Sequence, residues 1–305
     1  MGAGKHITGR IMNSIINFFS DYTLRNVFLG TMLLGIGSGF AGSFAVLRKQ
    51  SLLGDAVAHA ALPGIVIAFL ITGSKISLPL LLGAGISGLL GALFINLIVN
   101  TSKLDADAAQ AIVLGVFLGC GILLLTYIQK LPGAAKAGLD KFIFGQAATI
   151  MHTDVALIFF VELVSIILIL LFWKELKVST FDIDFSHSIG FSPKIIEGIL
   201  TFLIVVTIVI GIQSVGVILM SALLTAPAAA ARQWTNRLSV MCSLAAFFGA
   251  ASGIGGSIIS SQIEKMPTGP VIVCFLTVFA VLSILFGTNR GVVKNLLAAS
   301  RKKFL

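Results

Sequence analysis

The feature of this sequence that most limits its fold is a series of apolar stretches, each long enough to cross a membrane. About 20 residues of α-helix span the hydrocarbon core of a bilayer. Eight such stretches lie at residues 24–47, 54–72, 78–100, 108–129, 155–173, 195–220, 239–260 and 268–287. Because backbone polar groups must be satisfied internally in lipid, each is expected to form a helix. The sequence therefore predicts an all-α, polytopic membrane protein with about eight transmembrane helices.

Composition supports this class. Hydrophobic residues make up 57% of the 305 residues and charged residues 11%, whereas about a quarter of a soluble globular protein is charged. The net charge of +9 does not require a nucleic-acid partner, because Lys and Arg gather in the cytoplasmic loops of membrane proteins. We therefore expect membrane lipid around the chain and no nucleic acid.

The distribution of Lys and Arg predicts an orientation. With the N-terminus inside and eight crossings, most of the 21 Lys and Arg residues fall in inner segments, as the positive-inside rule requires. Residues 1–23 then form a cytoplasmic amphipathic lead-in, 24–287 a single transmembrane domain, and 288–305 a basic cytoplasmic tail. This arrangement places Arg48, Lys49 and the segment 174–194 outside.

The segment GDAVAHAALPG, residues 54–64, places Asp55 and His59 inside the second apolar stretch. A charged side chain at bilayer depth costs at least about 2.5–3.5 kcal/mol, so such a residue indicates a functional site. Residues four apart share a helix face, and a carboxylate with an imidazole suits Mn, Fe(II) or Zn better than Cu(I). We predict a divalent-metal site here. The alternative is a pair that only satisfies itself between helices.

Two residues cannot fill a coordination shell. Water, backbone carbonyls near Pro63, or residues of another helix or subunit must supply the remaining ligands. Pro63 and Gly64 are expected to shorten and interrupt the second span, as happens where backbone lines a cavity.

The segment SALLTAPAAAARQWTNRL, residues 221–238, ends an apolar stretch with cations and an indole. This pattern predicts one or two short helices at the cytoplasmic interface. They could dock a cytosolic subunit, or form an interfacial loop without a partner. The candidate coupling residues are Ala226, Pro227, Arg232, Trp234 and Arg237.

Glycine pairs spaced four apart recur within the spans, at Gly35 and Gly39, Gly115 and Gly119, and Gly249 and Gly253. Such pairs allow helices to approach closely in lipid, so they predict a tightly packed bundle. The sequence contains no G-x-x-x-x-G-K-[ST] phosphate loop. Active transport would therefore need another polypeptide that hydrolyses ATP, or an ion gradient.

The motif at residues 54–64, with the preceding LRKQSLL, resembles the signature of the integral-membrane permeases of the manganese, zinc and iron ABC importers. The segments 141–150, 178–190 and 211–238 are similar to further parts of that family, and the resemblance extends over about 24–287. It implies a type II ABC importer-like permease with cytoplasmic coupling helices near 221–238. It also implies metal ligands at Asp55 and His59, within a motif completed by Gly54, Pro63 and Gly64.

The same resemblance implies partners and a location. These are a homodimer, two cytosolic ATP-binding subunits and an extracytoplasmic metal-binding protein, in a bacterial cytoplasmic membrane. The distribution of Lys and Arg predicts that both chain termini lie inside. The chain would be a transport subunit and not an enzyme, with no permanently bound cofactor. The transported ion would be Mn, Zn or Fe(II), and the hardness of carboxylate, water and carbonyl ligands favours Mn. His187 with Asp182 and Asp184 could form a secondary outer metal contact or an ordinary solvated loop.

Two other transporter classes remain open on the residues alone. A proton-coupled secondary metal transporter would also carry an intramembrane Asp-His pair, but usually shows matching broken helices in both halves. The sequence has no second copy of the Pro63 break. A permease for cobalamin or chelated iron would share the architecture without needing Asp55 and His59, because a bulky ligand is held by shape and apolar lining.

Overall fold

The computed structural model describes residues 22–73, 77–130, 150–263 and 266–294. In these ranges the chain is helical and contains no strand, as predicted. Eight helices are long and apolar enough to cross a membrane, which confirms the predicted number of long apolar helices. They are α2 (Tyr22–Leu47), α3 (Leu53–Thr72), α4 (Ser77–Thr101), α5 (Ala106–Lys130), α7 (His152–Leu171), α10 (Pro193–Val215), α12 (Leu238–Gln262) and α13 (Thr268–Phe286). Three shorter helices are α8 (Trp173–Phe181), α9 (Ile183–Ser188) and α11 (Val217–Arg232).

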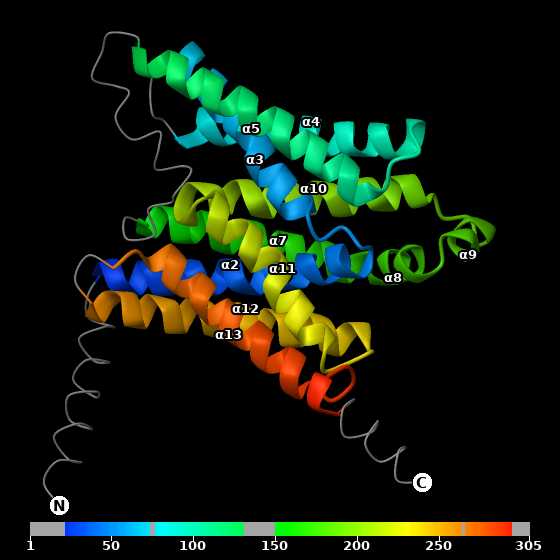
Figure 1. The fold of residues 1–305 in the computed structure, drawn as a ribbon. Coiled ribbons are helices and arrows are strands. Elements are labelled where there is room, and N and C mark those ends of the chain that lie inside the picture. Colours follow the sequence, from blue (N-terminus) through cyan, green and yellow to red (C-terminus); the bar gives the residue numbers. More distant parts are fainter. Residues whose placement is uncertain (1–21, 74–76, 131–149, 264–265, 295–305) are drawn as a thin grey trace, which may run out of the picture.

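The long helices lie side by side in one bundle with two ends (Figure 1). At one end, which we call the Tyr22 end, the backbone N–H of His152 donates to the Tyr22 hydroxyl at 3.3 Å. Gln213, near the end of α10, donates to Ser77 at the start of α4. At the other end, the Arg48 end, Arg48 contacts α8, and the α11–α12 connection meets the end of α13.

The sixth predicted span, 195–220, is in fact two helices that run in opposite directions. Gly216 separates α10 from α11 with φ 84°, a backbone conformation that glycine adopts readily. Val215 and Leu219 lie beside Gly269 at the start of α13. α11 then runs back to the Arg48 end, where Gln233 lies beside Gly287.

This reversal corrects the predicted topology. α2 begins at the Tyr22 end, and α13 ends at the Arg48 end (Figure 1). The prediction that both ends of the membrane domain lie on one side is therefore wrong, because α11 adds a passage through the bundle. The segments 174–194 and 232–237, predicted on opposite sides, lie at the same end: Trp173, Lys177 and Arg237 line one pocket.

Small residues let the central helices approach closely. A Cβ atom at Gly35 of α2 would meet the backbone of Gly249 in α12, and one at Gly39 would meet the backbone of Ala245. By contrast, a Cβ atom added at Gly115 of α5 would have no neighbouring atom within 4 Å. The predicted tight packing is thus found between α2 and α12, which run antiparallel. Around this contact lies a core of fully buried residues, including Leu34 and Phe44.

Candidate metal site and docking surface

Asp55 and His59 lie together near the start of α3. The distance from Asp55 Oδ1 to His59 Nε2 is 3.4 Å. The Asp55 side chain is 38% exposed and that of His59 18% exposed, although α3 is buried on most of its other faces. The pair therefore points away from the chain's own core. The two side chains lie on one face of α3, as predicted.

α11 adds a third polar group that the sequence did not indicate. The hydroxyl of Ser221 lies near the Asp55 carboxylate. It donates to the Ile218 carbonyl oxygen at 3.1 Å. The reversal at Gly216 brings Ser221 to α3, and no sequence spacing connects it with Asp55.

Gly54 and Gly64 allow α3 to pack closely against α11 and α4, and Pro63 changes the hydrogen bonding within α3. A Cβ atom at Gly54 would meet the Leu224 side chain of α11 at 2.6 Å, and one at Gly64 would overlap the Gly83 carbonyl of α4. Pro63 lies inside a continuous helix, so the predicted interruption of this span is wrong. Because proline has no N–H, it leaves the carbonyl of His59 without its helical donor.

The site is incomplete within one chain. In the described ranges, no group of three or more His, Cys, Asp or Glu side chains is arranged to hold a metal ion. The Nδ1 atom of His59 is buried and has no hydrogen-bond partner among these residues. The arrangement offers one carboxylate, one imidazole and a nearby hydroxyl on the face of α3 that points away from the core. A metal ion bound here would need further ligands from elsewhere.

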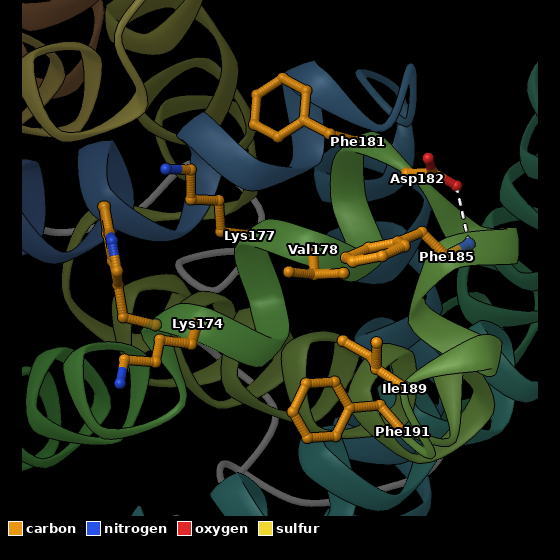
Figure 2. A pocket seen from close by; sticks show the side chains of 9 residues that line it. Lys174, Lys177, Val178, Phe181, Asp182, Phe185, Ile189 and Phe191 are labelled. Carbon is orange, nitrogen blue, oxygen red and sulfur yellow. Dashed lines mark hydrogen bonds between the residues drawn. The ribbon is translucent and has the colours of Figure 1, made fainter.

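α8 and α9 form an apolar hollow at the Arg48 end. Its volume is about 650 Å³. Figure 2 shows Val178, Phe185, Ile189 and Phe191 facing one another, while Lys174 and Lys177 extend to the side. Phe185 is 53% exposed. Sequence reasoning missed this surface, which it treated as an outer loop.

The residues predicted to couple to a cytosolic subunit differ in how exposed they are. The predicted short interfacial helices are instead the second half of α11, where Pro227 is fully packed and Ala226 partly buried. Trp234 is half-buried and donates from Nε1 to Ser283 at 2.9 Å. Arg232 is half-buried, whereas Arg237 is exposed.

The possible second contact around His187 gains no support. The carboxylate of Asp182 caps α9 by accepting a hydrogen bond from the Phe185 N–H at 2.8 Å. Asp184 and His187 are exposed. As noted above, no three-residue metal group is found in the described ranges.

Comparison with known proteins agrees with this architecture. The chain is 61% identical over 294 residues to the zinc transport system membrane protein TroC of Treponema pallidum, covering 96% of this chain and 99% of TroC. It is 47% identical over 266 residues to the manganese transport system membrane protein MntC of Bacillus subtilis, covering 87% of this chain and 61% of MntC.

A solved structure shares the fold. The structure of PsaBC from Streptococcus pneumoniae in complex with Fab matches with a TM-score of 0.79 and 30% identity, covering 93% of this chain and 99% of that chain. The ABC 3 transport family matches residues 20–287, which include every helix described above. This match and the relatives show that the chain belongs to the ABC 3 transport family.

Proposed function

We propose that this chain is the membrane-spanning subunit of an ATP-driven importer of Zn²⁺ or Mn²⁺, and that the ion passes Asp55 and His59. The observation that carries this proposal is the Asp55–His59 pair. Its Oδ1 and Nε2 atoms lie 3.4 Å apart, and both side chains are partly exposed on the surface of the chain. The printed functions of TroC and MntC support the substrate class. A secondary transporter would not belong to this family, and a permease for bulky chelates would not need the pair.

The orientation follows from the charged residues. Among the described residues, Lys and Arg gather at the Arg48 end, on Arg48, Lys49, Lys103, Lys174, Lys177, Lys194, Arg232, Arg237, Arg290 and Lys294. The Tyr22 end has Arg25 and Lys130. By the positive-inside rule, the Arg48 end faces the cytoplasm of a bacterial cell and the Tyr22 end faces outward. Asp55 and His59 then lie toward the cytoplasmic side, together with Arg48 and Lys49, which were expected outside.

A second copy of the chain would complete the metal site. One copy supplies a carboxylate and an imidazole, whereas a bound transition metal usually takes four or more ligands. A two-fold axis next to α3 would bring two Asp55 and two His59 side chains together. Such an isologous contact is the commonest arrangement of a homodimer. An extracytoplasmic metal-binding protein would deliver the ion at the Tyr22 end.

The ATP-binding subunit would dock on α8 and α9. The family is one of ABC transporters, and the chain itself lacks a phosphate loop. The α8–α9 surface lies at the proposed cytoplasmic end and exposes Phe181, Ile183 and Phe185. It has an apolar centre and a basic edge, a combination common in protein interfaces. Arg237, across the neighbouring pocket, would lie at the edge of the same interface.

Asp55 and His59 alone do not determine which metal ion is selected. Affinity at a site of nitrogen and oxygen ligands favours Zn²⁺ over Mn²⁺, whereas the hardness of added water or carbonyl ligands favours Mn²⁺. The zinc relative is more similar than the manganese relative. Uptake measured with both ions in competition would decide between them.

The test is metal uptake by the complete transporter in proteoliposomes, with the chain co-expressed with its ATP-binding subunit. Asp55→Ala and His59→Ala should each abolish ATP-dependent uptake of Mn²⁺ and Zn²⁺ without preventing assembly. Asp107→Ala and His152→Ala are matched controls, because both side chains are exposed at helix starts away from the pair. Undiminished uptake by the Asp55→Ala variant would overturn the proposal.

A further inference from the structure

Arg48 links the beginning of the metal-bearing helix to α8. Its guanidinium donates from Nε to Thr180 Oγ1 at 3.2 Å and from Nη2 to Ser179 Oγ at 3.2 Å. The planar guanidinium suits such a double contact, because its donors lie in a fixed fork. Below it, the Phe44 ring of α2 packs edge-on against Trp173 of α8, with ring centroids 5.8 Å apart. The end of α2 and α8 are therefore joined by polar and aromatic contacts.

Arg48 remains charged in this position. Burial lowers the pKa of the Arg48 guanidinium, and the carboxylate of Glu197 in α10 acts in the opposite direction. Arginine keeps its proton in proteins because its ordinary pKa is above about 12. Arg48 thus cannot serve as a metal ligand, and it brings a fixed positive charge to the junction of α2, α8 and α10.

The connection from Arg48 to Asp55 is short and internally hydrogen-bonded. Lys49 takes a left-handed conformation with φ 58°, and the Gln50 N–H donates to the Ala45 carbonyl at 2.9 Å, which closes the end of α2. The Leu53 N–H then donates to the Gln50 carbonyl at 3.2 Å. These bonds tie the end of α2 to the first residue of α3.

We propose that Arg48 is a positioning residue that makes the first turn of α3, with Asp55 and His59, follow the movements of α8. This inference rests on the proposed function, in which the ATP-binding subunit docks on α8 and α9. A change at that surface on ATP binding would be passed through Ser179 and Thr180 to Arg48, and through this hydrogen-bonded connection to the metal ligands. Without Arg48, ATP hydrolysis and ion movement separate.

The experiment measures metal transported per ATP hydrolysed in proteoliposomes that contain the complete transporter, with radioactive Mn²⁺ and Zn²⁺ as probes. Arg48→Met keeps an unbranched side chain but removes the donors. Lys49→Met is the matched control, because it removes a charge from the exposed neighbouring residue. We expect Arg48→Met to assemble and hydrolyse ATP while metal moved per ATP falls about tenfold, a typical coupling effect. Lys49→Met should leave the ratio unchanged.

A second variant tests the same link from α8. Ser179→Ala with Thr180→Val removes both hydrogen-bond acceptors and should lower the metal moved per ATP as Arg48→Met does. This double variant tests the inference if Arg48→Met does not reach the membrane. A ratio equal to that of the wild type in either assembled variant overturns the inference. Failure of the proposed function is distinguishable, because the wild-type complex itself would then show no ATP-dependent metal uptake.

Discussion

Gly37 of α2 leaves the space that the carboxyl group of Glu162 in α7 occupies. A Cβ atom at Gly37 would overlap Oε2 of Glu162, and the Glu162 side chain is only 2% exposed. Thr207 of α10 donates to the same oxygen at 3.4 Å. Three helices therefore meet at one buried carboxyl group, and the meeting requires glycine at position 37.

Gly37→Ala should destabilise the bundle by about 1–3 kcal/mol, the usual effect of forcing an extra atom into a packed core. The measurement is the thermal unfolding midpoint of the detergent-solubilised chain. Adding Glu162→Ala should restore part of the loss, because it removes the overlapping atoms. Gly119→Ala is the control, since nothing lies within 4 Å of a Cβ there. An unfolding midpoint equal to that of Gly119→Ala would contradict the expected overlap.

Glu162→Gln should preserve the fold. Glutamine keeps the size of the side chain and can still accept from the Thr207 hydroxyl, while it cannot carry the charge that burial in an apolar interior penalises. We expect stability within about 1 kcal/mol of the wild type. Glu162→Lys, which buries a longer charged group against Gly37, should fail to accumulate in the membrane. Immunoblotting of membranes and thermal unfolding give the two readouts, and strong destabilisation by Glu162→Gln would show that the ionised carboxylate is needed.

Gly64→Ala should separate α3 from α4. Its new Cβ would overlap the Gly83 carbonyl and disturb the bond that the Ser87 hydroxyl donates to the Ala60 carbonyl at 2.6 Å. The expected loss is about 1–3 kcal/mol by overpacking, with reduced metal uptake because α3 carries the site. Gly85→Ala, on α4 with nothing within 4 Å, should be neutral or slightly stabilising. If both variants unfold at the same temperature, the close contact at Gly64 is not required.

Hydropathy was sufficient to locate the long helices because each has enough apolar residues to span a bilayer. It could not separate α10 from α11, since the reversal at Gly216 lies inside one continuous apolar run and α11 has only 16 residues. Because α11 was not predicted as a separate crossing, the segments before α11 were placed on the wrong side of the membrane relative to the segments after it. The proposed docking surface on α8 and α9 was missed for the same reason, because 174–194 was expected outside.

The Asp55–His59 pair shows what local geometry can predict. Residues four apart on a helix face the same way whatever surrounds the helix, so Asp55 and His59 could be paired from their spacing. Ser221 could not, because its approach to Asp55 depends on how α11 packs against α3. Arg48 was visible in the motif, but its partners on α8 lie more than 130 positions away along the chain.

The corrected topology predicts which residues share a side of the membrane. In a background with Cys120, Cys242 and Cys274 replaced by alanine, single cysteines at Lys177 and Asn236 should react with an impermeant maleimide from the same side, because both residues line one pocket at the Arg48 end. A cysteine at Met151, exposed at the Tyr22 end, should react from the opposite side. With the proposed orientation, intact cells label Met151→Cys alone, and the other two require permeabilisation. Eight crossings without α11 would place Lys177 and Asn236 on opposite sides, so labelling of only one of them in intact cells would refute the passage formed by α11.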